Sequence, residues 1–111
     1  MMDYATYAQL WAEATQYADF DLYVSERGWQ GWMDAYADRS DSAVLDALQR
    51  IWDMAHDGTR AMRRLLGSSQ AAFAARFGIP TRTVENWESG SNLPPPYVIK
   101  LLGYAVLSIL D

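Results

Sequence analysis

Apolar residues recur at steps of three and four along most of the chain, the spacing that places side chains on one face of an α-helix. The pattern predicts a first helix over residues 3–19, begun by Asp3. A second helix is predicted over residues 21–36, weakened by Gly28 and Gly31, each costing about 1 kcal/mol relative to alanine. The polar residues 38–42 then break the pattern. The apolar stripe of the first helix consists of Tyr4, Tyr7, Leu10, Trp11, Ala14, Tyr17 and Ala18.

From Ser42 onward the apolar repeat continues without interruption through Gly58 to Leu65. This indicates either one long helix bent near Gly58 or two helices meeting there, with residues 59–66 as the last part. A final helix is predicted over residues 97–110, where only Lys100 and Ser108 are polar, so something must cover it. The protein's own N-terminal half is expected to cover most of it, and a second copy of the chain the remainder. The predicted fold class is all-α, a compact helical bundle.

Residues 68–90, SSQAAFAARFGIPTRTVENWESG, are predicted to form two short helices joined by a tight turn. Ser69 is a helix cap, and Gly78 stops the first helix because glycine adopts the left-handed conformation at little cost. Pro80 allows the second helix to begin only at or just after itself, and Gly90 ends that helix. The first helix is expected to bury Ala71, Phe73, Ala74 and Phe77. The second is expected to bury Val84 and Trp87 and to expose Thr81, Arg82, Glu85 and Asn86.

This segment resembles the phage-repressor-like (XRE-type, Cro-like) helix-turn-helix family, over about residues 59–102. The resemblance implies a DNA-binding unit whose second helix lies in the major groove. It implies that Thr81, Arg82 and Asn86 reach bases, that Gln70 touches the backbone or a flanking base, and that Arg63 forms a buried structural pair with Glu88. An αα-hairpin that only packs is the alternative. The matching positions are Gln70, Ala74, Gly78, Ile79, Thr83, Val84, Trp87, Glu88 and Gly90.

The side chains of the recognition helix suit particular bases. Arg82 suits bidentate reading of guanine, Asn86 suits adenine, and the Thr81 methyl suits thymine. The connector after Gly90, SNLPPP, departs from the family because it has no basic residue, so modest affinity is expected. The residues expected to contact the DNA backbone or flanking positions are Gln70, Ser69, Thr83, Glu85, Ser91, Asn92, Arg60 and Arg64.

The balance of charged side chains changes sign near residue 58, where the segment that resembles a helix-turn-helix begins. The net charge is −5, but residues 1–58 carry three basic against eleven acidic side chains, a balance of −8. Residues 59–111 carry six basic against three acidic side chains, a balance of +3. This asymmetry is typical of a nucleic-acid-binding face joined to a different working surface. Together with the resemblance it predicts a helix-turn-helix DNA-binding unit over residues 58–111 and an acidic, aromatic-rich helical platform over residues 1–57, which is a dimer or partner surface. The two parts are expected to pack as one compact unit.

Catalytic and metal sites find little support in the sequence. Cysteine is absent, and the lone histidine, His56, is expected to be a solvated or hydrogen-bonded surface residue and not a metal ligand. No phosphate loop, nucleophile elbow or zinc-protease motif occurs. We therefore expect no enzyme activity, no catalytic residue and no cofactor. The sequence has no signal-peptide pattern and no membrane-length apolar run, so a cytoplasmic protein is expected.

The expected role is a regulator that binds double-stranded DNA, a repressor controlling its own promoter and reading a palindrome as a homodimer. The resemblance implies that this regulator is a small prokaryotic or mobile-element protein. The alternative is a protein-interaction module, such as an antitoxin or a phage or mobile-element inhibitor, that binds a partner protein through its acidic N-terminal half. Exposure of Trp11, Trp29 and Trp32 would favour the partner, whereas their burial would favour a structural platform.

Overall fold

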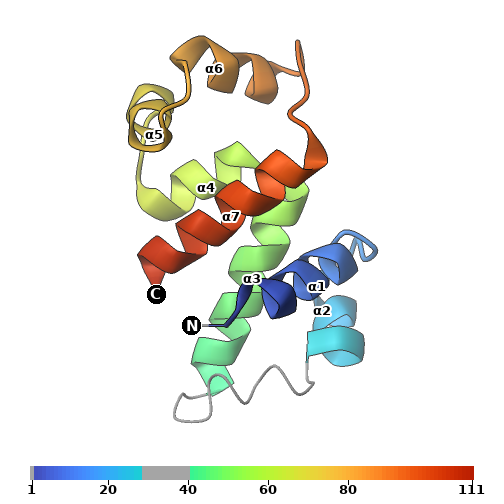
Figure 1. The fold of residues 1–111 in the computed structure, drawn as a ribbon. Coiled ribbons are helices and arrows are strands. Elements are labelled where there is room, and N and C mark those ends of the chain that lie inside the picture. Colours follow the sequence, from blue (N-terminus) through green and yellow to red (C-terminus); the bar gives the residue numbers. More distant parts are fainter. Residues whose placement is uncertain (1, 29–40) are drawn as a thin grey trace.

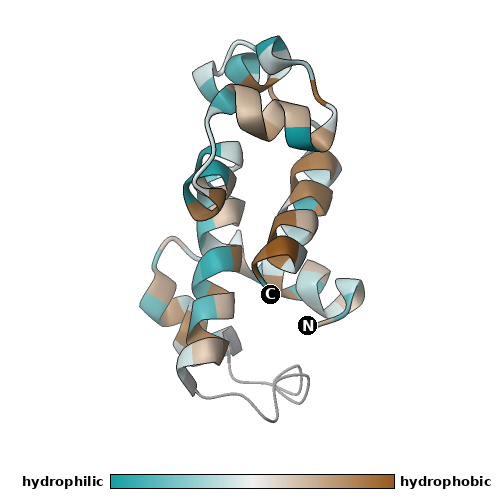
Figure 2. Ribbon diagram, turned by 90° about the vertical axis from the view of Figure 1, so that its left-hand side faces the viewer, coloured by the Kyte–Doolittle hydropathy of each residue, from teal (hydrophilic) through white to brown (hydrophobic). Residues whose placement is uncertain are grey.

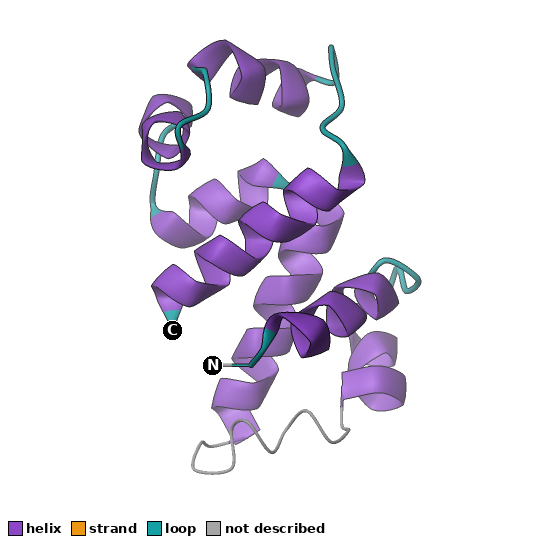
Figure 3. Cartoon of the chain, viewed as in Figure 1, coloured by secondary structure: helices purple, strands orange, loops and turns teal. Residues whose placement is uncertain are grey.

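The computed structural model describes residues 2–28 and 41–111, and every regular element in those ranges is helical (Figure 3). This confirms the predicted all-α fold class. The N-terminal elements are α1 (Tyr4–Ala14), α2 (Phe20–Tyr23), the π-helical turn η1 (Val24–Gly28) and α3 (Asp41–Asp57). The elements that follow are α4 (Thr59–Leu66), α5 (Gln70–Phe77), α6 (Thr81–Ser89) and α7 (Pro96–Leu110).

The first predicted helix is correct at its start and too long at its end. Asp3 caps α1, its carboxylate accepting a hydrogen bond from the Thr6 amide at 2.8 Å. The helix ends at Ala14, because the chain tightens after it and the Thr15 hydroxyl donates to the Ala12 carbonyl at 2.7 Å. Asp19 then caps a new helix by accepting from the Asp21 amide. Tyr17 is therefore outside α1, although its ring still packs on the core.

The second predicted helix is confirmed as helical over residues 21–28, but it is not a regular α-helix there. Residues 20–28 form the single turn α2 followed by the wider turn η1 instead of a continuous α-helix. The remainder of that prediction falls on residues 29–40, outside the described residues, and so do Trp29, Gly31 and Trp32.

The long apolar repeat after Ser42 forms two helices, which decides between the two alternatives. Gly58 separates α3 from α4 with φ +58° and ψ −134°, a conformation that essentially only glycine adopts. Its amide donates to the Met54 carbonyl at 2.9 Å, and its carbonyl accepts from the Met62 amide at 3.2 Å. The glycine thus completes one helix, begins the next and changes the direction of the chain.

The C-terminal helix α7 is covered mainly by the protein itself. It packs across α3 and α4 and meets α1 at its N-terminal half (Figure 1). Figure 2 shows that α7, which ends at the C-terminal label, is apolar along nearly its whole length. Val106 and Leu107 are buried, whereas Tyr97, Leu101 and Ile109 remain exposed to 63 %, 50 % and 46 %. The N-terminal half therefore covers most of α7 and leaves a narrow apolar stripe.

Aromatic residues join α1 to α7. The buried Tyr7 hydroxyl donates to the Lys100 carbonyl at 2.7 Å, and the Tyr104 hydroxyl donates to the Met2 carbonyl at 2.9 Å. Gly103 lies directly under the α1 aromatics: a Cβ atom there would clash with the Tyr7 hydroxyl and lie 2.8 Å from Trp11 Cζ3. Because Trp11 is itself buried in this contact, α1 is part of the core and not a loose appendage.

Candidate nucleic-acid interface

The helices α5 and α6 form a hairpin at one end of the molecule, away from α1 and α2 (Figure 1). The Ser69 hydroxyl caps α5 by accepting from the Ala72 amide at 3.1 Å, as predicted. Gly78 ends α5 with φ +66°, and α6 begins directly after Pro80. On α5, Phe73 and Ala74 are buried, but Ala71 is exposed, contrary to the prediction, because it lies on the outer side of the first turn.

The outer face of α6 carries the residues predicted to read bases. Thr81, Arg82 and Glu85 are exposed, and Asn86 is half-buried beside them. Within the described residues, the Arg82 guanidinium has no hydrogen-bond or ion-pair partner. Val84 is fully buried on the opposite side and holds the helix to the core. A helix with one anchored and one free polar face can enter a DNA groove without unfolding.

Glu88 anchors the inner face of α6 to two other helices. Its carboxylate accepts from Arg63 Nη2 at 2.6 Å and Arg63 Nε at 2.9 Å, a bidentate pair. It also accepts from the Thr59 hydroxyl at 2.8 Å and the Gln70 amide at 3.3 Å. With 5 % of its side chain exposed, Glu88 joins α6 to α4 and α5. The pair with Arg63 that the resemblance implied is therefore present.

The environment of Glu88 acts on its pKa in two directions. Burial by itself raises the pKa of a carboxyl, because it penalises the charged form. The hydrogen bonds from Arg63, Thr59 and Gln70 outweigh that effect, so the pKa of Glu88 lies below its ordinary value. The same contact raises the pKa of Arg63. Both groups are charged near neutral pH, and the anchor is intact there.

Sequence analysis missed one member of this anchor and gave another only a DNA role. Thr59 was not singled out, although it stands four residues before Arg63 on the same face of α4, which was the signal available. The resemblance gives Gln70 a contact with DNA, whereas in the structure its side chain is half-buried and donates to Glu88. Both side chains help to set the position of α6 relative to α4 and α5.

The residues predicted to contact the DNA backbone differ in how free they are. Arg60 Nη2 donates to the Glu88 carbonyl at 2.6 Å, and Arg64 pairs with Asp57 at 2.9 Å, so both guanidinium groups already have protein partners. Ser91 and Asn92 are exposed in the connector after α6, and Thr83 is half-buried. The freest polar groups thus lie on α6 and at its C-terminal end.

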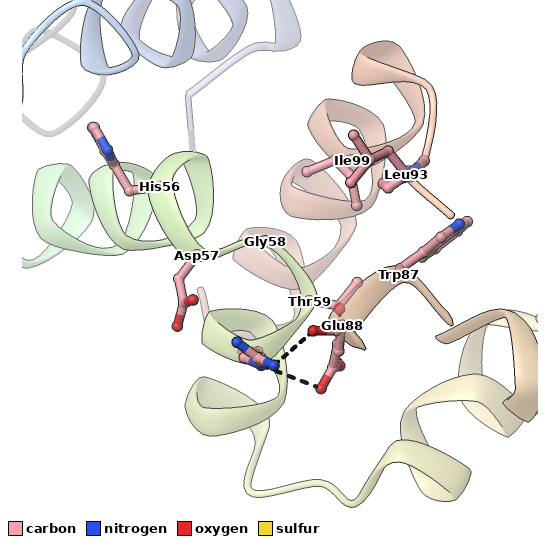
Figure 4. A pocket seen from close by; sticks show the side chains of 10 residues that line it. His56, Asp57, Gly58, Thr59, Trp87, Glu88, Leu93 and Ile99 are labelled. Atoms are coloured by element: carbon pink, nitrogen blue, oxygen red, sulfur yellow. Dashed lines mark hydrogen bonds and ion pairs between the residues drawn. The ribbon is translucent and has the colours of Figure 1, made fainter. Parts of the chain in front are cut away.

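The prediction that Trp87 is buried in the core is wrong. Its indole is only partly buried and lines a pocket together with Leu93 of the connector and Ile99 of α7 (Figure 4). The reason lies in the angular order of α6, where Val84 and Glu88 face the centre of the α4–α5 surface. Trp87 falls to the side of that line, where the connector leaves it partly open.

His56 lies at the surface, as predicted. Its Nε2 atom is 2.8 Å from the Ala14 carbonyl, and its ring stacks on Trp52 with 4.2 Å between centroids. Among the residues that the structure describes, no group of three or more histidine, cysteine or acidic side chains could hold a metal ion. None of the helices in those ranges is both long and apolar enough to cross a membrane.

Comparison with known proteins agrees with this geometry. The model of the helix-turn-helix family matches residues 60–104, which run from the first turn of α4 into α7. No curated protein and no solved structure matches the chain. The matched range contains both helices of the hairpin, the Arg63–Glu88 pair and the exposed face of α6. Residues 60–104 therefore match a helix-turn-helix family of the XRE type, in the segment where the sequence resembles that family, and the match supports DNA binding in general.

Proposed function

We propose that this protein is a cytoplasmic transcriptional regulator that binds a palindromic operator as a homodimer and represses its own promoter. The observation that carries the proposal is the exposed face of α6, where Arg82, which has no partner among the residues that the structure describes, stands beside Thr81 and Asn86. Such a face is suited to the donor and acceptor pattern of the major groove. The anchor at Glu88 supports the proposal, since a helix that reads bases must be held in one orientation.

In this proposal each outer residue of α6 has a role. Arg82 donates two hydrogen bonds to guanine, Asn86 pairs with adenine, and the Thr81 methyl packs on thymine. Ser69, Thr83, Ser91 and Asn92 contact phosphates or flanking sugars, Gln70 lies at the edge of the contact, and Glu85 faces the flanking bases. Arg60 and Arg64 add charge near the backbone while keeping their protein partners.

The proposed dimer uses the apolar stripe of α7. Tyr97 and Leu101 lie about one helical turn apart, Ile109 lies about two turns further along the helix, and all three are exposed in the single chain. Large apolar side chains exposed in a row are typical of surfaces that a partner covers. Because a two-fold axis places two recognition helices on successive turns of DNA, a dimer through this stripe supports palindrome reading.

The experiment that tests the proposal is selection from a randomised duplex library at low and moderate salt, followed by sequencing of the retained DNA. Recovery of a palindrome with half-sites about one helical turn apart is the expected result. The matched variant Leu101→Ser should retain half-site preference and lose the fixed spacing. Retention that falls uniformly with salt and enriches no sequence would reduce the interaction to nonspecific contact.

A second function is favoured by one observation in the acidic half. A groove of about 400 Å³ between α2, η1 and α3 is lined by Phe20, Val24 and Leu45, with Asp21 and Asp46 at its edge. An apolar groove with an acidic edge is suited to a basic amphipathic helix of a partner protein. The burial of Trp11, in contrast, favours the platform role, and Trp29 and Trp32 lie outside the described residues. Leu45→Lys should abolish such binding and leave DNA selection unchanged.

A further inference from the structure

A pocket lies where the joint between α3 and α4 approaches the end of α6 and the connector to α7 (Figure 4). Its volume is about 270 Å³, close to the lower end of the range for small-molecule sites. It borders the recognition helix through Trp87 and Glu88 but lies off the exposed face that carries Arg82. Neither the DNA-reading face nor the α7 stripe accounts for it.

One side of the pocket is apolar and open to solvent. Trp87, Leu93 and Ile99 gather there in Figure 4, and Pro94 completes the wall. Leu93 is 80 % exposed, the largest exposure among the large apolar side chains that the structure describes. An exposed leucine beside a partly exposed indole offers a surface that a flat apolar ring can cover. Consecutive prolines after Leu93 hold the connector and leave this wall preformed.

The other side of the pocket is polar and carries one surplus positive charge. Glu88 is neutralised by Arg63, and Asp57 is paired with Arg64, so both carboxylates are already compensated. Arg60 donates through Nη2 to the Glu88 carbonyl, and its Nε lies 3.9 Å from Glu88 Oε1, but its side chain is 55 % exposed, which leaves N–H groups open to a ligand. His56 adds no competing group here, because its ring points away from Trp87 and toward Ala14.

We propose that this pocket binds a small amphipathic carboxylate, a planar apolar ring bearing one acid group. The ring covers Trp87 and Leu93, and the carboxylate accepts hydrogen bonds from Arg60. Charge decides for an acid over an amine, since Glu88 and Asp57 are paired with Arg63 and Arg64, whereas Arg60 shares Glu88 with Arg63 and is half-exposed. The size of the pocket limits the ligand to one or two fused rings.

Occupation of this pocket has a consequence for DNA binding, which rests on the proposed function. The ligand contacts Trp87 of α6 on one side and Arg60 of α4 on the other. It therefore acts on the contact between α4 and α6, which Glu88 also stabilises. A ligand that prefers one arrangement of this joint changes DNA affinity, and DNA changes ligand affinity by the same factor.

The test is titration of the full chain with 2-naphthoate, followed by two-dimensional amide and indole NMR in the absence of DNA. The Trp87 indole signal is assigned from Trp87→Phe. Shifts confined to Gly58, Thr59, Trp87 and Leu93, with saturation, are expected. The neutral analogue 2-naphthamide should bind at least about fivefold more weakly, and Arg60→Gln should cause a similar loss for naphthoate. The control Arg50→Gln removes a guanidinium from a different helix, α3, and should leave the affinity for naphthoate unchanged.

The proposal is overturned if naphthoate shifts no signal in this pocket, or if naphthamide or the Arg60→Gln variant binds equally well. Because this titration contains no DNA, its outcome does not depend on the outcome of the operator selection. Repeating the titration with the selected operator then tests the coupling alone. Equal naphthoate affinity with and without operator would leave a binding site that does not regulate, and would refute the regulatory part.

Discussion

Glu88 is the residue on which the orientation of α6 depends most directly. Four hydrogen bonds from three residues enter its carboxylate, and a hydrogen bond to a charged group contributes about 1.5 to 3 kcal/mol. Its lowered pKa links this anchor to pH. A carboxyl whose folded pKa is lowered contributes stability that is fully present above its unfolded pKa, and that is lost as pH falls through the folded value.

We therefore expect the free energy of unfolding to fall as pH drops below about 4.3, the ordinary pKa of glutamate. The isosteric Glu88→Gln variant should be less stable at pH 7 and should show a shallower decline below that pH. Chemical denaturation at a series of pH values measures both. Parallel pH profiles for the two proteins would mean that Glu88 titrates alike in the folded and unfolded chain.

Arg82 is the residue on which sequence preference is expected to depend. Because it is exposed and unpaired in the described part of the chain, Arg82→Ala should leave the fold intact. It should cost about 1 to 3 kcal/mol in specific binding and relax preference at one base pair. Selection with the variant measures the preference, and an unchanged consensus would remove Arg82 from base reading.

At the scale of elements, the contact between α1 and α7 depends on one small residue. A Cβ atom on Gly103 meets the Tyr7 hydroxyl and Trp11, and Tyr7 cannot move freely because it is buried and bonded to the Lys100 carbonyl. Gly103→Ala should therefore destabilise the protein by about 1 to 3 kcal/mol, although alanine favours helix formation. Thermal unfolding measures this, with the exposed Ser108→Ala as the control on the same helix. Equal losses in both variants would contradict the packing explanation.

At the scale of the whole molecule, several cations of the described residues already have protein partners and are not free to meet phosphate. Arg63 is bound to Glu88, Arg64 to Asp57, and Arg60 partly to α6, while Arg82 is exposed. With the chain at −5 overall, we expect about two or three phosphate contacts per protomer and a logarithmic salt dependence of about −2 to −3 per protomer. Titration at several salt concentrations measures the slope. A slope steeper than about −6 would show that ion pairs within the protein break when it binds DNA.

The N-terminal half and the DNA-binding segment share one core. Tyr7 and Leu10 of α1, Leu48 and Ile51 of α3, and Val106 of α7 are all buried in the same cluster. We therefore expect the two parts to unfold in one transition. Hydrogen exchange should report similar protection for α1 and α4, and early exchange confined to α1 would contradict a shared core.

Local signals in the sequence determined the helix class, the hairpin and the polar face of α6. Caps and breakers act within a few residues, so Asp3, Ser69, Gly78 and Pro80 mark helix ends that the structure confirms. The spacing of the family motif likewise placed Arg63 opposite Glu88. Each of these features depends on neighbours along one helix or on a short, recurring arrangement of helices.

Only the tertiary structure decided which apolar residues are buried and which polar groups are free. The apolar spacing of α6 predicts that Trp87 is buried, yet it lines a pocket, because its burial depends on where the connector and α7 pass. Arg60 and Arg64 look free in the sequence, but their partners lie on α6 and at the end of α3. Gly58 separates two helices in a repeat that continues across it. Periodicity fixes one face of a helix, whereas packing between distant segments determines what meets that face.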